Sequence, residues 1–502
     1  MRPVNGPVLA GAVFLVLLSG CGGGGRSPQA PVIPVSAATD SAERFVLPLA
    51  GLHNEDGRLV DSIGRTVVLR GINAVDKTGW NGVLAGPILS ASDAQTIAGM
   101  GFNHVRLGTT WESLEHERDV FDEAYVEQFL RVLDDLYEAG VLAVVDLHQD
   151  VWSRGIGFDG APAWADPQCN QTLELPLAEV TGTWFAQYGS PATNTAWANF
   201  WFDGYGSADL HCTGPIQTEF VDMWRWFASR LAGHPAVVGY DMLNEPWPSA
   251  PPGVFEQTQL FPMYARVAAA IRESDTHTPV YFGPPLYSPA TPTIALEPPD
   301  PNAVFAPHIY TETMFSGGNL STDAASDEVA IQKDLGDGER MGVPVWIGEW
   351  GEVQVADYTT AFYDLLDRYQ IGSAFWAYRQ RPGEEPRTVE TEQPHVRIWV
   401  EAWSGDAGWS FDPESGHFEL SVTPLPGTHV VRVVVPSRLG LTNFPQGTLY
   451  DPVAQRLLWC VEGASMQTLT LGPTGNSSTS SCELSMLADE VITQDVSGKS
   501  GT

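Results

Sequence analysis

The feature that most constrains this chain is a regular alternation of short apolar runs with amphipathic segments between about residues 58 and 380. The runs are rich in Val and Ile and almost continuously apolar, which is typical of strands buried on both faces. The segments between them repeat apolar residues at helical spacing, as in Phe129–Leu136, Phe220–Leu231 and Met263–Ile271. The eight predicted strands are Val67–Asn73, His104–Leu107, Leu142–Leu147, Val237–Leu243, Val280–Gly283, Val304–Pro307, Val345–Gly348 and Ser373–Trp376.

Eight β-α units in succession predict an α/β fold, a (β/α)8 barrel of the TIM type over residues 45–384. Its largest insertion, about 151–216, follows the third strand and is rich in Trp, Phe and Tyr. Because it follows the carboxyl end of a strand, we expect it over the active face of the barrel. It either packs on itself as a small core or forms one wall of a long apolar binding groove.

The pattern changes in residues 385–485, where short β-branched runs are separated by Pro and Gly turns. These runs predict a C-terminal antiparallel β-sandwich domain, which is a carbohydrate-binding module, a brace for a lid or a packing partner that shields the side of the barrel. The predicted strands are His395–Val400, His417–Val422, His429–Val435 and Arg456–Cys460. The polar tail, residues 486–502, is predicted to be disordered.

The N-terminus has the pattern of an export signal. An apolar run from Val8 to Leu18 is too short to span a bilayer comfortably, so residues 1–21 are predicted to be a signal peptide. The sequence Leu18-Ser19-Gly20-Cys21 resembles the bacterial lipobox, which implies lipidation at Cys21; the alternative is a plain secretory signal with an incidental cysteine. Residues 22–44 predict a flexible tether. We therefore expect a secreted lipoprotein anchored to a bacterial membrane and facing outside.

Four further cysteines would meet an oxidising compartment after export, where disulfides persist. Their proximity in the sequence and the domain division favour two pairs, Cys169 with Cys212 and Cys460 with Cys482. The chain has neither a Cys-x-x-Cys nor a His-Glu-x-x-His motif, so we expect no metal and no cofactor. The net charge of −35 disfavours nucleic acid as a partner. We also expect the protein to be a monomer.

Polar and aromatic residues stand at the ends of six predicted strands. In a barrel of this type the carboxyl ends of the strands share one rim, so these side chains are the catalytic and binding candidates. They are Arg106 at the end of the second strand, His148-Gln149-Asp150 at that of the third, Asn244-Glu245-Pro246 at that of the fourth, His308-Ile309-Tyr310 at that of the sixth, Glu349 at that of the seventh and Trp376 at that of the eighth.

Glu245 and Glu349 each follow an otherwise apolar strand, and the fourth and seventh strands lie across the barrel mouth from each other. Hydrolysis of a glycosidic bond requires such a pair, one acid to protonate the leaving oxygen and one carboxylate to attack the anomeric carbon or activate water. The alternative is that either glutamate is the buried partner of an ion pair. A carboxyl separation of about 5–5.5 Å would give retention of configuration, and about 6.5–9.5 Å inversion.

Asn244-Glu245-Pro246, Glu349, Arg106 and His308-x-Tyr310 together resemble glycoside hydrolase family five, the cellulase-like family of clan A. The resemblance implies that Glu245 is the general acid/base and Glu349 the nucleophile of a retaining double displacement. It also implies supporting roles for the other strand-end residues. Asn244 would bind the sugar 2-hydroxyl, Arg106 would neutralise the nucleophile, Tyr310 would donate to it beside His308, Trp376 would be a sugar platform, and His148 would lie beside the sugar.

A narrower set of motifs resembles the endoglycoceramidases, as does the barrel-plus-sandwich plan over about residues 45–475. The motifs are Gly71–Lys77, His148-Gln149-Asp150 with Gly160–Trp164, and Tyr240–Trp247. These enzymes cut the β-glycosidic bond between the glycan and the ceramide of a glycosphingolipid, so the resemblance implies a glycolipid substrate, with Lys77 and Asp150 binding sugar hydroxyls. The alternatives are an endo-β-glucanase or mannanase acting on polysaccharide, a β-glucosidase acting on another lipid such as a steryl glucoside, and a binding lipoprotein on a catalytically dead barrel.

Overall fold

The computed structural model describes residues 46, 48–79, 86–167, 184–203, 215–286, 297–310, 325–351, 356–386 and 392–482, all within one compact unit, residues 43–502. Its largest sheet is wholly parallel, with the strand order β11-β10-β9-β6-β5-β4-β14-β13-β12. The bounds are β4 (Arg70–Val75), β5 (His104–Thr110), β6 (Leu142–His148), β9 (Val237–Asp241), β10 (Val280–Phe282), β11 (Ala303–Phe305), β12 (His308–Ile309), β13 (Trp346–Gly351) and β14 (Gly372–Arg379).

The two ends of this sheet meet, which confirms the predicted barrel. The end strand β11 pairs with β10, and a parallel bridge joins its Phe305 to Val345, next to β13. The other end strand, β12, pairs with β13 and follows β11 after only two residues, Ala306 and Pro307. Pro307 has no backbone N–H to donate, and the sixth barrel strand is interrupted there. The nine strands are therefore eight barrel strands, one of them in two halves.

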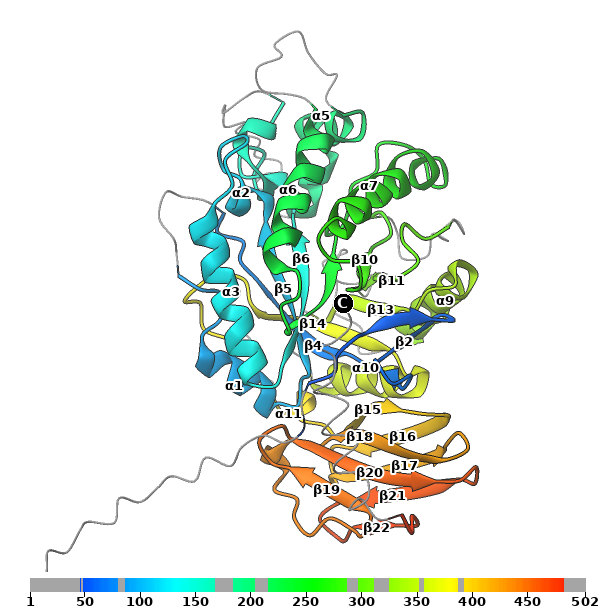
Figure 1. Ribbon diagram of the computed structural model, residues 1–502. Helices are drawn as coiled ribbons and strands as arrows, with labels where there is room; N and C mark the ends of the chain where they lie inside the picture. The colour runs from blue at the N-terminus through cyan, green and yellow to red at the C-terminus, as the bar shows by residue number, and fades with distance from the viewer. Residues whose placement is uncertain are drawn as a thin grey trace, which may run out of the picture. The chain divides into compact units, whose positions relative to one another are not determined.

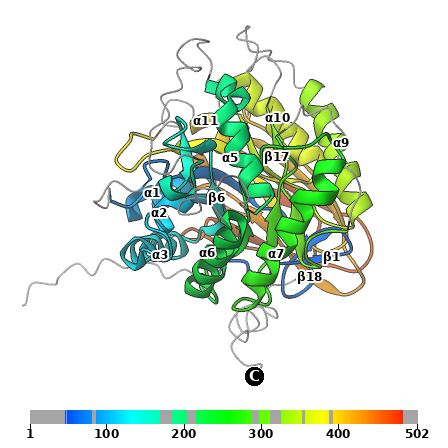
Figure 2. The ribbon, with the colours of Figure 1, turned by 90° about the horizontal axis from the view of Figure 1, so that it is seen from above.

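Helices cover the outside of the ring. Figure 2, a view from above, shows α3, α6, α7, α9 and α10 around the strands. Amphipathic spacing holds them there; α3 buries Phe129, Val132, Leu133 and Leu136, each contributing about 1.5–3 kcal/mol of transfer free energy. The bounds are α1 (Ala91–Gly99), α2 (Trp111–Leu114), α3 (Glu123–Glu138), α6 (Ile216–Leu231), the π-helical η3 (Glu256–Leu260), α7 (Phe261–Arg272), α9 (Ala325–Met341), α10 (Ala356–Tyr369) and α11 (Glu392–His395).

The described part of the insertion packs mostly on itself. It contains β7 (Val151–Ser153), β8 (Asp159–Ala161), η1 (Ala163–Ala165), η2 (Trp184–Gly189) and α5 (Pro191–Trp201). Trp197 and Phe200 are each 1% exposed, and the ring of Trp152 meets that of Trp197 edge-on at 5.1 Å. At the end of α5, in contrast, Phe202 is 61% exposed. This part of the insertion is thus a small aromatic core with one apolar side chain left at the surface.

Two antiparallel sheets form the C-terminal module. The larger has the order β1-β2-β3-β15-β18-β20-β19 and the smaller β16-β17-β21-β22. A separate apolar cluster, including Trp399, Phe418 and Trp459, draws its residues from both sheets. The bounds are β15 (Trp399–Trp403), β16 (Asp406–Asp412), β17 (His417–Thr423), β18 (Thr428–Val434), β19 (Thr448–Asp451), β20 (Arg456–Glu462), β21 (Gln467–Leu471) and β22 (Ser477–Ser478).

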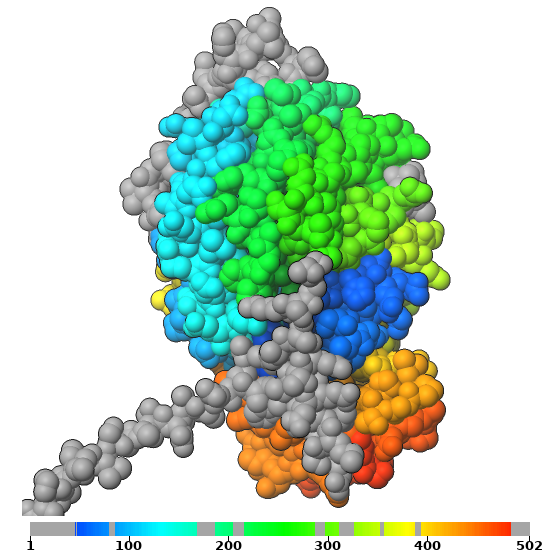
Figure 3. Space-filling model, in the orientation of Figure 1, coloured from blue at the N-terminus to red at the C-terminus, as the bar shows by residue number. Residues whose placement is uncertain are grey.

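Three N-terminal strands belong to this module, although the sequence-based division placed them with the barrel. They are β1 (His53–Glu55), β2 (Arg58–Val60) and β3 (Thr66–Val67), and β3 pairs with β15 through Val67 and Ala402. Figure 3 shows their blue surface directly beside the orange surface of the C-terminal strands. The predicted strand Val67–Asn73 was therefore wrong at its start: the barrel strand begins at Arg70, and a continuously apolar run gives no sign of where the chain changes sheets.

A second strand boundary was also wrong, because His395 ends α11 and β15 begins only at Trp399. The predicted disulfide between Cys460 and Cys482 is confirmed. Cys169, Cys212, Cys21, the tether and the C-terminal tail lie outside the described residues. Among the helices that the structure describes, none is both long enough and apolar enough to cross a membrane.

The barrel and the C-terminal module share a buried carboxylate at Asp367. This residue lies in α10 and pairs with Arg70 of β4 at 2.7 Å and with Arg397 at 3.1 Å. It also accepts a hydrogen bond from Nε1 of Trp409, in β16, at 2.8 Å. Figure 1 shows α10 next to β15 and β16.

A second buried carboxylate, Glu401 of β15, lies between two arginines of the larger sheet. Arg432 and Arg456 each approach it to 2.9 Å, and Asn103, just before β5, donates to it at 3.1 Å. The two carboxylates and their partners together form what we call the junction network: Asp367 with Arg70, Arg397 and Trp409, and Glu401 with Arg432, Arg456 and Asn103.

Candidate active site

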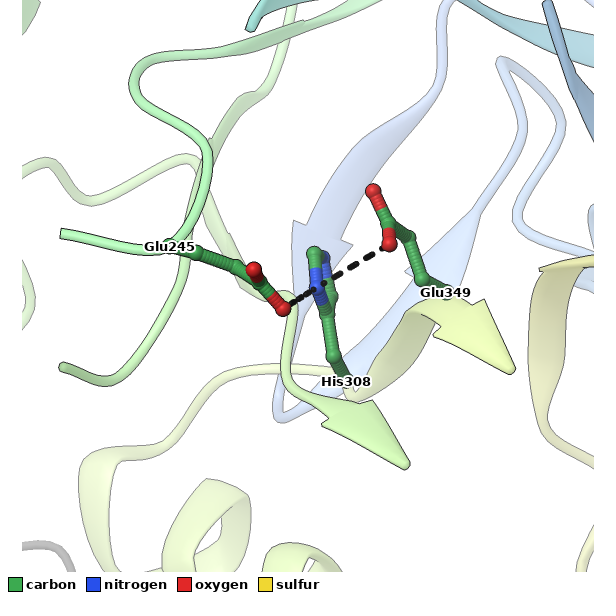
Figure 4. A group of neighbouring side chains, drawn as sticks. All are labelled: Glu245, His308 and Glu349. Atoms are coloured by element: carbon green, nitrogen blue, oxygen red, sulfur yellow. Dashed lines mark hydrogen bonds and ion pairs between the residues drawn. The ribbon is translucent and has the colours of Figure 1, made fainter. Parts of the chain in front are cut away.

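Two carboxylates and an imidazole meet at the carboxyl ends of the barrel strands. Glu245 follows β9, His308 begins β12 and Glu349 lies in β13. His308 Nδ1 is 2.9 Å from Oε1 of Glu245 and 3.6 Å from Oε2 of Glu349, and Figure 4 shows its ring between the two acids. One carboxylate oxygen of Glu245 lies within 4.8 Å of one of Glu349. This spacing suits retention, at about 5–5.5 Å, and leaves too little room for the water of an inverting site.

The guanidinium of Arg106, in β5, is buried among three carboxylates. Its Nη1 is 2.6 Å from Glu349, and its Nη2 is 2.8 Å from Asp146 and 2.8 Å from Asp241. Burial lowers the pKa of Arg106, but the charges of these carboxylates raise it by more. The predicted contact between Arg106 and Glu349 is therefore present, as one arm of a larger cluster.

Sequence analysis missed Asp146, Asp241 and Asn73, which complete this cluster. Asp146 also bonds Nδ1 of His148 at 2.8 Å, and Asn73 Oδ1 accepts from Arg106 at 3.1 Å. Each is a polar residue inside an apolar strand, and Asp146 lies two positions before His148, on the same face of β6. Asp146 could have been predicted from this spacing, because a polar residue two positions before a strand-end candidate lies on the same face of the strand.

Both carboxylate oxygens of Glu349 carry a hydrogen bond. Arg106 donates to Oε1, and the hydroxyl of Tyr310 donates to Oε2 at 2.7 Å. Asn244 lies beside them, with its Oδ1 accepting from Arg106 at 3.0 Å and its Nδ2 donating to the backbone oxygen of Gln149 at 3.0 Å. The structure thus brings together the five residues predicted around the nucleophile, which are Arg106, Asn244, Glu245, His308 and Tyr310.

The remaining predicted sugar-binding residues form a second group. Lys77 pairs with Asp150, and its Nζ lies 4.5 Å above the ring of Trp376. The ring of His148 stacks against that of Trp376 with centroids 5.4 Å apart. His148 also joins this group to the Arg106 cluster, because its Nδ1 bonds Asp146 and its Nε2 is 3.7 Å from Asp150.

These contacts shift the protonation of several buried groups. Burial and Lys77 lower the pKa of His148, but Asp146 and a hydrogen bond to Asp150 raise it by more, to about 9. Burial likewise lowers the pKa of His308, and the charges of Glu349 and Glu245 more than reverse the effect. Burial, with the charge of Asp150, raises the pKa of Asp159 to about 7. Asp159 is a further residue that sequence analysis missed.

Within the described part of the chain, two groups of side chains have atoms close enough to share a metal ion. One is Glu245, His308 and Glu349, and the other is the acidic group Glu115, Asp119 and Glu219. In the first group, Arg106 and Tyr310 already donate to the two oxygens of Glu349. The arrangement is better suited to proton transfer and nucleophilic attack than to holding a cation.

The backbone at Glu245 has a left-handed conformation, with φ of 41°. For a residue other than glycine this costs about 1–3 kcal/mol and persists only where the surroundings hold it. The sequence Asn244-Glu245-Pro246 is therefore a strained turn that presents the acid at the rim.

A closed parallel barrel with two carboxylates this close at its strand ends defines a retaining glycosidase site. The model of the cellulase family, glycosyl hydrolase family 5, matches residues 60–381, and the chain belongs to this family.

Individual relatives are similar to this chain over most of its length. Endoglycoceramidase I of Rhodococcus hoagii is 29% identical over 415 residues, which is 77% of this chain and 80% of that protein. A solved endogalactoceramidase is 27% identical, with a TM-score of 0.63, and covers 85% of this chain and all of its own. Endo-glycoceramidase II from Rhodococcus sp., in complex with ganglioside GM3, has a TM-score of 0.69 at 23% identity over 84% of this chain and all of its own, a likeness of fold.

Proposed function

We propose that this protein hydrolyses the β-glycosidic bond between the glycan and the ceramide of glycosphingolipids, with retention of configuration. The observation that carries the proposal is the similarity to endoglycoceramidase I over 415 residues, joined to a carboxylate pair within 4.8 Å. The pair supports the reaction type, and the similarity supports the substrate class.

In the first step of this mechanism Glu349 attacks the anomeric carbon and Glu245 protonates the leaving oxygen, which releases ceramide. Arg106 and Tyr310 hold the two oxygens of Glu349 and so fix the direction of attack. The product of the step is a covalent glycosyl-enzyme.

In the second step Glu245, now a carboxylate, removes a proton from water, and that water attacks the anomeric carbon and frees Glu349. His308, within hydrogen-bonding reach of Glu245, steadies the carboxyl group in both protonation states. Asn244 binds the 2-hydroxyl of the sugar, a contact that strengthens in the transition state.

The second group of polar residues binds the sugar. Lys77 and Asp150 offer hydrogen bonds to hydroxyls, His148 lies beside the reacting sugar, and Trp376 provides the aromatic face on which the ring packs. Lys77 and Asp150 carry opposite charges and pair with each other.

Exposed apolar side chains of the insertion and of the segment after β9 support a lipid aglycone. Trp247 follows Glu245 by two residues, its ring is 4.8 Å from that of Tyr188, and its backbone oxygen accepts from Trp201. Phe202, next to Trp201, is 61% exposed, and Val254 is 53% exposed. These side chains suit an alkyl chain better than the polar face of a polysaccharide.

The test is product release from a panel of glucosyl-, galactosyl- and lactosylceramide, a steryl glucoside and soluble β-glucans and mannans. We expect intact glycan and ceramide from at least one glycosphingolipid, and no release by Glu245→Gln or Glu349→Gln. Cleavage of soluble glucans alone would contradict the substrate and leave the family unaffected. Cleavage of the steryl glucoside alone would support the second lipid candidate.

We further propose that the protein is an exported, lipid-anchored monomer. The lipobox-like sequence ending in Cys21 supports the anchor. We expect Cys21→Ser to move the protein from the membrane fraction to the soluble fraction, with the same specific activity in detergent. Membrane association that is unchanged in Cys21→Ser would count against lipidation there.

A further inference from the structure

Gln149, which follows β6, makes three hydrogen bonds to the turn that carries Glu245. Its Nε2 donates to the backbone oxygen of Asn244 at 2.7 Å and to that of Glu245 at 2.9 Å, while its own backbone oxygen accepts from Asn244 Nδ2 at 3.0 Å. The residue is 4% exposed. Two consecutive peptide units on either side of the catalytic Cα are thus fixed by one amide group.

That turn requires such support. Glu245 is held at φ of 41°, a conformation disfavoured for glutamate, and Pro246 follows it without an N–H group that could anchor the backbone. The orientation of both peptide planes sets the direction of the Cα–Cβ bond of Glu245. A small rotation there moves the carboxyl group away from the leaving oxygen, and general acid catalysis is sensitive to such a displacement.

Residues of the insertion pack against Gln149. A Cβ on Gly160 of β8 would lie 2.4 Å from the Cβ of Gln149, so only a glycine fits against it. Beyond it, Gln149 lines a small apolar cavity together with Trp152, Phe200 and Leu243.

We propose that Gln149 is a positioning residue for the general acid/base: it fixes the Asn244-Glu245 backbone and thereby aims the Glu245 carboxyl group. The inference rests on the role proposed for Glu245. It gives the insertion a function in catalysis, because Gly160 and the aromatic core set the place of Gln149. Loss of Gln149 should therefore slow proton donation to the leaving group, with little effect on sugar binding.

Substrates that differ only in the leaving group separate this role from a general loss of structure. The probes are the phenyl and the dinitrophenyl β-glycosides of whichever sugar the wild type releases. Dinitrophenolate leaves without protonation, whereas phenolate needs the acid. For Gln149→Met we expect kcat/KM on the phenyl glycoside to fall about ten- to a hundredfold with KM nearly unchanged, and kcat/KM on the dinitrophenyl glycoside to fall less than about threefold. An equal fall on both substrates, or none on either, would overturn the proposal.

Three further variants make the result decisive. Gln187→Met removes a buried glutamine of the same insertion, 1% exposed, whose Nε2 donates to Ile156 O at 2.9 Å, and should leave the ratio of the two substrates at the wild-type value. Gln149→Asn keeps the amide but shortens its reach by one methylene, so it decides the question if Gln149→Met does not fold. Glu245→Gln must show the same preference for the dinitrophenyl glycoside. If it does not, the role of Glu245 fails; if it does and both Gln149 variants do not, the inference about Gln149 fails.

Discussion

The barrel mouth and the junction network both bury arginines with carboxylates, but in opposite proportions. At the mouth one guanidinium, that of Arg106, forms ion pairs with three carboxylates, Asp146, Asp241 and Glu349. In the junction network each carboxylate lies between two arginines: Asp367 with Arg70 and Arg397, and Glu401 with Arg432 and Arg456.

The difference in proportion has a chemical consequence. An excess of carboxylates at the mouth raises the pKa of His148 and of His308, so protons are retained there. An excess of arginines in the junction network outweighs the effect of burial and lowers the pKa of Asp367, and that of Glu401 to about 2. At neutral pH His148 is therefore protonated, whereas Asp367 and Glu401 in the junction network are ionised and paired with their arginines.

The largest expected effect comes from removing the nucleophile. Glu349→Gln should lower kcat/KM by about a thousandfold or more, about 4 kcal/mol in the barrier, because no covalent intermediate forms. Glu115→Gln is the matched control, since Glu115 is also buried but bonds Trp111 and Asp119 instead. Steady-state kinetics of both variants, with unfolding curves, check this. A variant of Glu349 with near wild-type kcat/KM would contradict the assignment.

Breaking each network by removing one charge compares the two regions directly. Arg106→Met leaves three carboxylates without their shared cation, and Glu401→Gln leaves two arginines without their anion. Both should lose about 3–5 kcal/mol in the free energy of unfolding, measured with denaturant. Only Arg106→Met should also lose activity in the folded protein, by about a hundredfold or more. Equal activity loss in Glu401→Gln would show that the junction network couples to the mouth.

Opening the disulfide tests whether the C-terminal module only supports the barrel. The bond between Cys460 and Cys482 closes a loop with a sequence separation of 22. Cys460→Ser with Cys482→Ser should therefore cost about 3 kcal/mol of stability through the entropy of the unfolded chain. We expect kcat/KM at a temperature well below unfolding to remain within about twofold. A selective loss of activity would place the module closer to catalysis than its contacts indicate.

Titration should affect the two regions at opposite ends of the pH scale. Glu401 has a folded pKa lowered from 4.5 to about 2, so its stabilisation is complete above pH 4.5 and is lost as the pH falls towards 2. His148 has a folded pKa raised from 6.5 to about 9, so its stabilisation is complete below pH 6.5 and is lost as the pH rises through 9. The measurement is the free energy of unfolding as a function of pH. We expect His148→Gln to remove its alkaline slope and Glu401→Gln to remove its acid slope. An unchanged slope in either variant would contradict that assignment.

The sequence by itself determined the barrel and most of its rim. Apolar runs at regular intervals require parallel strands buried on both faces, and the carboxyl ends of such strands share one edge. Glu245, Glu349, Arg106 and Tyr310 could be grouped on this argument before their distances were known. The Cys460–Cys482 pair followed equally from short separation along the chain.

Only the tertiary structure decided the contacts between residues far apart in the sequence. Arg106 meets Asp241 across 135 residues, Val67 crosses into the sheet of Ala402, and Gln149 reaches the backbone of Glu245. Periodicity reports which face of a strand is buried but not which distant side chain lies opposite, because that depends on strand order and closure of the ring. The catalytic candidates could therefore be predicted from local sequence patterns. The charged and amide side chains that orient them come from distant parts of the sequence and are brought there only by the fold.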